Sequence, residues 1–223
     1  MTDAIQTPTR LRIDFVSDVV CPWCAIGLAS LEQALERTRG EVEADIHFQP
    51  FELNPQLGGE GEDAAGHLQR KYRMSAAQAA ANQESIRQRG AALGFTFDME
   101  RRRRIYNTFD AHRLLHWAGE VGHERELKHA LLRAYFTDGR DVSDHDTLVD
   151  IAAGAGLPPD RAREVLATGT YADEVRTAER FFVQQGIQGV PAIIIERRHL
   201  VSGGQPVEVF EQALRRIATQ VHA

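Results

Sequence analysis

The stretch LRIDFVSDVVCPWCAIGLASLEQAL, residues 11–35, contains the features that decide the fold. Its first six residues alternate between apolar and polar side chains, which is the pattern of a half-buried strand. Leu28, Leu31 and Leu35 then recur at the spacing of one helix face, and Gly40 marks the end of that helix. Cys21 and Cys24 are therefore expected at a turn from a strand into a helix.

The rest of the chain repeats these two patterns around a long helical stretch. Residues 44–53 alternate again and predict a second strand, whereas the glycine-rich residues 58–62 form a break. From this break to about Gly169 the pattern predicts helices, one of them opening with a capping box at Ser75. Residues 171–221 predict a helix, a short apolar strand, its hairpin partner and a final helix.

This order of elements predicts an α/β protein with a thioredoxin fold that is interrupted by an all-helical insertion domain. We expect residues 10–57 and 170–223 to form one discontinuous thioredoxin-like domain, because both halves are needed to complete one sheet. Residues 58–169 are expected to form the helical insertion.

Composition excludes several classes of function. The net charge of −6 argues against a surface for nucleic acid or anionic membranes. The apolar runs are far shorter than the roughly 18 residues that a transmembrane helix needs. The polar residues 1–12 predict no secretory signal, so a cytoplasmic location is expected.

The chain has only 2 cysteines, and their spacing limits what they can do. A disulfide across so short a loop adds little stability, because the gain grows with the length of chain that it closes. A structural zinc site usually needs four ligands, and no second cysteine pair is present to supply them. Two inert buried cysteines, or zinc completed by histidines, are the alternatives to a redox pair; we favour the redox pair and expect no metal.

The position of the pair at a helix start suits thiol–disulfide exchange. The unsatisfied N–H groups of the first turn stabilise a thiolate at Cys21, and Cys24 lies one turn into the helix within reach of it. Pro22 fits between them because the first helical position needs no N–H. We therefore predict that Cys21 attacks the substrate and that Cys24 resolves the mixed disulfide.

A second candidate feature lies far away in the sequence, where Val190-Pro191 directly precedes the apolar strand at 192–195. A cis peptide bond there would expose the Val190 backbone for pairing with an extended peptide. A trans proline at the start of the strand fits the residues equally well.

Several motifs spread along the chain occur together in a known family. They are Ser17-Asp18-Val19-Val20-Cys21-Pro22-Trp23-Cys24, Phe51-Glu52-Leu53-Asn54-Pro55, Asn107-Thr108, Ala111-His112-Arg113-Leu114, Gly186-Ile187-Gln188-Gly189-Val190-Pro191 and Val201-Ser202-Gly203-Gly204-Gln205-Pro206. In combination, from about Leu11 to Val221, they resemble the FrnE-like branch of the DsbA family, a group of thiol–disulfide oxidoreductases in the thioredoxin superfamily.

The resemblance implies a thioredoxin domain with an inserted helical domain, a redox-active Cys21–Cys24 disulfide as the only redox group, and a cis proline at 191. We expect polypeptide thiols and disulfides as substrates, with glutathione or a thioredoxin-type reductant as candidate partners. DsbA itself carries histidine where Trp23 stands, so the resemblance leaves oxidase, isomerase and reductase activities open.

Two other classes of function are compatible with parts of this pattern. Kappa-class glutathione transferases and hydroxychromene-carboxylate isomerases look similar but carry serine at the first cysteine, so one alternative is a glutathione-dependent enzyme acting on a small aromatic molecule. The other is a non-catalytic peptide-binding or chaperone module. The presence of both Cys21 and Cys24 favours disulfide exchange.

Three further residues are predicted to line the cleft beside the redox pair. The resemblance places Asn107 and His112 over the cleft, although a histidine at position 112 could equally belong to the core. Phe51 is a candidate for an apolar rim together with Trp23, and it could equally belong to the core. The basic run Arg101-Arg102-Arg103-Arg104 predicts a solvated helix start rather than a phosphate-binding patch.

Overall fold

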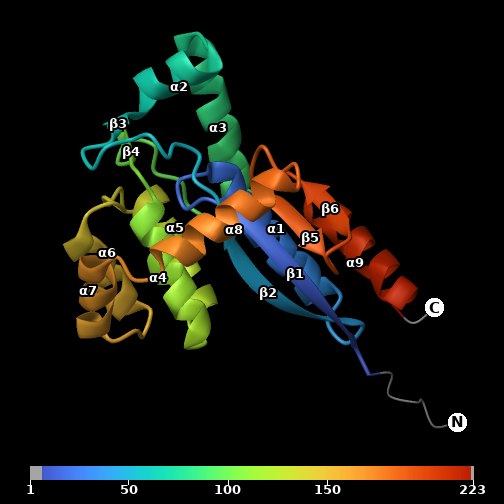
Figure 1. The fold of residues 1–223 in the computed structure, drawn as a ribbon. Helices are drawn as coiled ribbons and strands as arrows, with labels where there is room; N and C mark the ends of the chain where they lie inside the picture. The colour runs from blue at the N-terminus through green and yellow to red at the C-terminus, as the bar shows by residue number, and fades with distance from the viewer. Residues whose placement is uncertain (1–6, 222–223) are drawn as a thin grey trace, which may run out of the picture.

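The computed structural model describes residues 7–221 (Figure 1). Residues 1–6, on which part of the expectation of no secretory signal rests, lie outside the described residues, as do residues 222–223. Over the described range, no helix combines the length and apolar character needed to cross a bilayer.

A four-stranded mixed sheet forms the centre of the fold, with the strand order β2-β1-β5-β6. The strands are β1 (Thr9–Ser17), β2 (Val42–Pro50), β5 (Ala192–Ile195) and β6 (His199–Ser202). β1 pairs in parallel with β2 and antiparallel with β5, and β6 extends the sheet as the antiparallel partner of β5. The two halves of the chain therefore complete one sheet, as predicted.

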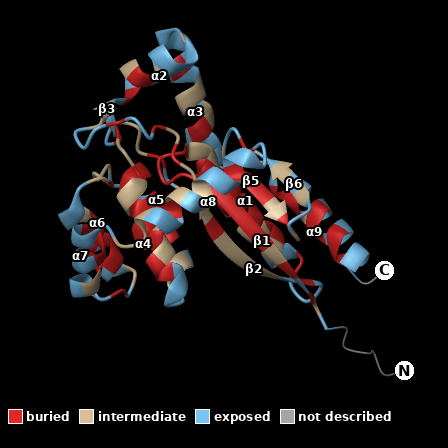
Figure 2. Cartoon of the chain, viewed as in Figure 1, coloured by how far each residue is buried: buried red, intermediate tan, exposed pale blue. Residues whose placement is uncertain are grey.

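The alternation along β1 decides which helices cover each face of the sheet. Leu11, Ile13 and Phe15 are fully buried in a cluster that also contains apolar residues of α1 (Pro22–Arg37) and α9 (Val207–Val221). Val16 points to the other face and packs against Phe182 of α8 (Ala172–Gln184). In Figure 2 the central strand β1 is mostly coloured as buried, whereas β2 and the edge strand β6 are mostly intermediate or exposed.

The stretch between β2 and α8 is mainly helical. Its helices are α2 (Ala64–Tyr72), α3 (Ala76–Ala92), α4 (Phe109–Glu120), α5 (Glu124–Phe136), α6 (His145–Gly154) and α7 (Pro159–Thr168). The predicted capping box at Ser75 is present. A short ladder between β3 (Glu62–Asp63) and β4 (Arg104–Ile105) interrupts the helices.

These elements confirm the predicted fold class, an α/β thioredoxin fold with a helical insertion. The boundaries of the two predicted domains stay a prediction. The largest core cluster runs through both parts, since it contains Phe48 of β2 and Leu131 of α5.

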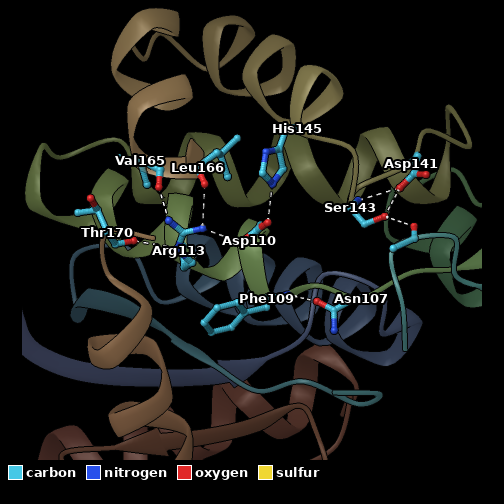
Figure 3. A network of polar contacts seen from close by, with 11 residues as sticks. Asn107, Phe109, Asp110, Arg113, Asp141, Ser143, His145, Val165, Leu166 and Thr170 are labelled. Carbon is cyan, nitrogen blue, oxygen red and sulfur yellow. Dashed lines mark hydrogen bonds and ion pairs between the residues drawn. The ribbon is translucent and has the colours of Figure 1, made fainter. Parts of the chain in front are cut away.

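Arg113 on α4 holds the helices of the insertion together (Figure 3). Its guanidinium is buried and donates to the carbonyl oxygens of Val165, Leu166 and Thr170, with the last at 2.8 Å. It also donates to Asp110 on its own helix at 2.7 Å. The Val165 and Leu166 carbonyls lie in the last turn of α7, where helical carbonyl groups lack partners within the helix, and Thr170 follows that helix. Arg113 therefore has a structural role.

The basic run at 101–104 does not begin a helix, so that prediction was wrong. Asp98 accepts hydrogen bonds from the backbone of Glu100 and Arg101 and so forms a turn there. Arg102 is buried and its Nε donates to the hydroxyl of Tyr135 at 3.0 Å. Four adjacent arginines thus have different environments, which charge alone could not reveal.

Candidate active site

Cys21 occupies the N-cap of α1, and Pro22 is the first residue of the helix. The Cys21 carbonyl oxygen accepts hydrogen bonds from the backbone N–H groups of Cys24 at 3.0 Å and Ala25 at 3.3 Å. The strand β1 ends at Ser17, so the pair lies at the strand-to-helix turn that the sequence predicts. The fixed φ of Pro22 suits this first helical position.

The two cysteines are free thiols with different environments. Cys24 is completely buried, whereas Cys21 retains 3 % of its surface and lines a cavity. Burial raises the pKa of the Cys24 thiol well above its ordinary value, and its hydrogen bond with Cys21 raises it further. Only Cys21 is thus presented to a molecule from outside.

The Val190–Pro191 peptide bond is cis, as the family resemblance implies. The Cys21 thiol donates a hydrogen bond to the carbonyl oxygen of Val190, with a sulfur–oxygen distance of 3.6 Å. Val190 is half-buried and lines the same cavity as Cys21. The structure therefore brings together the Cys21–Cys24 pair and the Val190-Pro191 segment.

Two glycines allow the start of α1 to approach this segment. A Cβ atom on Gly27 would lie 3.1 Å from Cγ of Pro191, and one on Gly204 would lie 2.8 Å from the carbonyl oxygen of Trp23. The second distance is too short for any side chain. Gly204, part of the Gly203-Gly204 turn, is therefore needed to position the first turn of α1.

The cavity beside Cys21 has a volume of about 450 Å³, and we call it the Cys21 cavity. One wall consists of residues 20–23 and Val190, and the other is formed by α2, α3 and the segments that follow β2 and precede β4. Its size is within the usual range of small-molecule or peptide sites.

Cationic side chains lie in the wall opposite Cys21. Nζ of Lys71 donates to the carbonyl oxygen of Leu53 at 2.8 Å and to Oδ1 of Asn54 at 2.7 Å. Arg102 and buried His67 line the same cavity, and Nε2 of His67 has no hydrogen-bond partner among the described residues. Desolvation lowers the pKa of Lys71, whereas the charges of Asp18 and Cys21 oppose this shift. The cavity therefore favours anionic groups.

Asp18 connects the first two sequence motifs. Its buried carboxylate accepts a hydrogen bond from the backbone N–H of Leu53 at 2.7 Å and lies 3.6 Å from Nε2 of His112. Although burial alone would raise the pKa of Asp18, the interactions with His112 and the Leu53 N–H outweigh it and lower the pKa. Glu52, the residue before Leu53, binds Arg176 of α8.

The predicted site residues fall into two groups. Pro22, Trp23 and Val190 line the Cys21 cavity, whereas Pro191 is not part of its lining and lies next to Gly27 of α1. The other three predicted residues lie outside its lining for different reasons. The Asn107 amide accepts a hydrogen bond from the Phe109 backbone at 2.9 Å (Figure 3), His112 is buried against Asp18, and Phe51 packs in the cluster around Val16.

Lys71, His67 and Arg102 were not predicted. They reach the cavity because the helical insertion packs beside the sheet, and no local pattern in the sequence signals this. Within residues 7–221, no group of three or more His, Cys, Asp or Glu side chains is arranged to hold a metal ion.

Comparison with known proteins gives relatives over nearly the whole chain. A probable DsbA oxidoreductase from Streptomyces coelicolor is 41% identical, with a TM-score of 0.86 over 94% of this chain and 90% of that structure. The protein YwbO of Bacillus subtilis is 28% identical over 92% of this chain and 96% of its own length. The cytosolic disulfide reductase DsbM from Pseudomonas aeruginosa, solved with GSH, shares the fold at 17% identity and a TM-score of 0.64, over 96% of this chain and 100% of that one.

The family model of the DsbA-like thioredoxin domain matches residues 12–215, which include the redox pair, the helical insertion and the Val190-Pro191 segment. The chain therefore belongs to the DsbA-like thioredoxin domain family, and this membership supports an oxidoreductase.

Proposed function

We propose that the protein exchanges disulfides with extended polypeptide segments through Cys21 and Cys24. The observation that carries the proposal is the position of the Cys21 thiol, which lies at the N-cap of α1, opens on a cavity and is hydrogen-bonded to Val190. A thiolate formed there gains from the positive end of the helix.

The proposed reaction has two steps. The Cys21 thiolate attacks a substrate disulfide, forms a bond to one sulfur atom and releases the other as a thiolate. Cys24 then attacks the sulfur of Cys21, which releases the substrate and leaves a Cys21–Cys24 disulfide. The burial of Cys24 supports this order of events, because an outside disulfide has no access to it.

Val190 is the proposed docking point for the substrate backbone. A peptide lying in an extended conformation along residues 189–191 could pair with the Val190 backbone and bring its own disulfide to Cys21. A shallow hollow lined by Val190, Pro191 and neighbouring residues of β5 and β6 continues the Cys21 cavity along this segment.

Glutathione is the second candidate substrate, either as a mixed disulfide with a protein or as the reductant. It carries two carboxylates, and Lys71 and Arg102 in the cavity wall offer positive charge to them. DsbM, a relative in fold, has been solved with GSH. A cytoplasmic location belongs to the same proposal and is supported by the scarcity of cysteine, since reducing compartments disfavour structural disulfides.

Reduction of insulin tests the proposed activity. With dithiothreitol or glutathione as the electron source, the wild-type protein should accelerate precipitation of the insulin B chain, and Cys21→Ser should abolish the acceleration. Equal rates for the wild type and Cys21→Ser would instead support a non-catalytic peptide-binding module. Conjugation of glutathione to an aryl halide by Cys21→Ser would support the transferase alternative.

A further inference from the structure

A groove on the α8 side of the sheet, which we call the α8 groove, lies outside the site described above. Its volume is about 650 Å³, and it shares no lining residue with the Cys21 cavity. Asp14, Ile194 and Leu200 form one row across β1, β5 and β6 and belong to its lining. The remaining lining comes from α8, the end of β2 and the turn between β5 and β6.

Apolar side chains are left uncovered in this groove. Phe181 of α8 and Leu200 of the edge strand β6 are each 53% exposed. Ile194 is only half-buried although its strand lies between β1 and β6, because α8 packs on the neighbouring row of the sheet, where Val16 and Ala192 are buried. Exposed apolar surface in a hollow is typical of a binding site for another molecule.

The turn between β5 and β6 brings two arginines to the groove. Glu196 and Arg197 have φ values of 53° and 55°, a left-handed conformation that favours glycine or asparagine in such hairpin turns. The Glu196 carboxylate accepts a hydrogen bond from the backbone N–H of Arg12, which helps to hold the turn. Arg197 and Arg198 line the groove, and neither guanidinium has a hydrogen bond or ion pair within residues 7–221. Strained backbone is thus kept where two free cations are held.

The free charges in the lining of the groove favour an acidic occupant. Arg12 and Asp14 neutralise each other at a distance of 2.7 Å. Glu174 of α8 is the one carboxylate of the lining without a partner in the described part of the chain, and the two free guanidinium groups outnumber it. An occupant that combines acidic and apolar groups therefore complements this surface.

Shared lining residues connect the α8 groove to the Cys21 cavity. Val190 lines both the Cys21 cavity and the shallow hollow along residues 186–192. Ile187 and Leu200 line both that hollow and the α8 groove. The 4 residues of β5 separate Val190 from the turn that carries the arginines, which is a length of about 13 Å. An extended chain that passes Val190 therefore reaches the arginines about four to six residues from its own cysteine.

We propose that the α8 groove binds the flanking segment of an extended polypeptide substrate, and that Arg197 and Arg198 recognise acidic residues about four to six positions from the substrate cysteine. Apolar side chains of the same segment pack against Phe181 and Leu200. The inference rests on the proposed exchange reaction and names the class of its polypeptide substrates. A chain fits better than a small anion, because the groove is continuous with the cavity that Cys21 lines.

Mixed disulfides between single-cysteine peptides and a coloured nitrobenzoate thiol test this proposal. Attack by Cys21 on the peptide sulfur releases the coloured thiolate, so the rate of release at limiting peptide concentration reports recognition of the peptide. One peptide carries a pair of aspartates about five residues before the cysteine, and another carries them about five residues after it. Asparagine replaces the aspartates in the matched peptides, and the mixed disulfide of glutathione is the short reference substrate.

At low ionic strength we expect the wild type to react about three- to tenfold faster with one aspartate peptide than with its asparagine counterpart. The double variant Arg197→Gln, Arg198→Gln should lose this preference and still react with the glutathione disulfide within about twofold of wild type. The double variant Arg133→Gln, Arg216→Gln is the matched control and should keep the preference. It removes two exposed arginines that lie outside the groove and whose side chains also lack partners among the described residues.

Leu200→Thr provides a second test if the double variant in the turn does not fold. Threonine suits an edge strand but removes the apolar contact. All the long peptides should then react about twofold or more slowly, whereas the rate with the glutathione disulfide should not change. Unchanged rates with the long peptides, or an equal loss with glutathione, would contradict docking in the groove.

Equal rates for the aspartate and asparagine peptides in wild type, or a preference that survives in the double variant of the turn, would overturn the proposal and leave exchange at Cys21 standing. If equal rates are accompanied by binding of anilinonaphthalene sulfonate to the wild type and not to that variant, the groove is a site for a small amphipathic anion instead. No release of coloured thiolate from any substrate would contradict the proposed function itself.

Discussion

The sulfur atom of Cys21 lies 3.6 Å from the carbonyl oxygen of Val190, the residue joined to Pro191 by a cis peptide bond. The two residues come from opposite ends of the chain and meet because β5 pairs with β1. Under the proposed function, a substrate backbone that pairs with Val190 would be held directly beside the thiol. Positioning of this kind accelerates exchange by holding the reacting sulfur atoms close together.

Lys71→Met should slow attack by Cys21 on an anionic disulfide by roughly two- to fivefold at low ionic strength, as expected for one largely exposed charge. The reason is that Nζ of Lys71 is held at the cavity wall by Leu53 and Asn54 and offers positive charge to both the thiolate and the substrate. The measurement is the rate at which the reduced protein releases the first coloured thiolate from a symmetrical nitrobenzoate disulfide, recorded at several salt concentrations.

The matched control is Arg87→Met, which removes an exposed charge on α3 that pairs with Glu84 outside the Cys21 cavity. Its rate should equal that of wild type at every salt concentration. A Lys71→Met rate that is slower by the same factor at low and high salt would contradict an electrostatic role for Lys71.

Arg113→Met should lower the free energy of unfolding by about 2–4 kcal/mol, because it leaves buried carbonyl oxygens and Asp110 without their charged donor. The guanidinium donates to Val165, Leu166 and Thr170, which α7 and the turn after it present to α4. Urea unfolding followed by circular dichroism measures the change. Arg163→Met, an exposed residue of α7, should change stability by less than about 0.5 kcal/mol; equal losses in both variants would refute the role of Arg113.

Glu124 should make stability fall as pH rises between about 4.5 and about 7. Burial raises its pKa to about 7 in the folded protein, so over this window the folded state holds a proton that the unfolded state releases. The contribution is present below the unfolded pKa and is lost as pH rises through the folded pKa. Its size is on the order of 3 kcal/mol, since one pKa unit corresponds to about 1.36 kcal/mol and the pKa rises from 4.5 to about 7.

Glu124→Gln should therefore match wild type in stability near pH 4 and exceed it near pH 8, with urea unfolding at several pH values as the measurement. Glu126→Gln removes an exposed carboxyl from the same helix turn and should leave the pH dependence of the wild type in place. A Glu124→Gln curve parallel to that of the wild type would show that Glu124 ionises normally.

The sheet and the strand-to-helix turn at Cys21 could be predicted from sequence, because the residue patterns that indicate them are local. Alternation along β1 and the position of Pro22 after Cys21 are readable within a few residues. The Cys21 cavity could not be predicted, because Lys71 reaches it only where α2 packs against the segment that follows β2. The sequence left His112 as a candidate either for the cleft or for the core, and only the packing of α4 shows that its imidazole is buried against Asp18.

The burial of Lys128 is indicated by a local pattern in the sequence. It lies on the helix face of Leu131 and Tyr135, both fully buried, so the helical period alone places a lysine among core positions. The sequence does not show, in contrast, that α5 packs beside α1, where Glu32 contacts Arg125 and His129. Long-range packing of this kind has no local counterpart in the sequence.

Mass spectrometry of the intact protein tests the exchange reaction most directly. After incubation with a peptide disulfide, Cys24→Ser should accumulate one peptide adduct on Cys21, because the residue that resolves the mixed disulfide is missing. Cys21→Ser should remain free of adducts, since Cys24 is completely buried. Adducts on Cys24 in the Cys21→Ser variant, with none on Cys21 in Cys24→Ser, would contradict the assignment of the two cysteines.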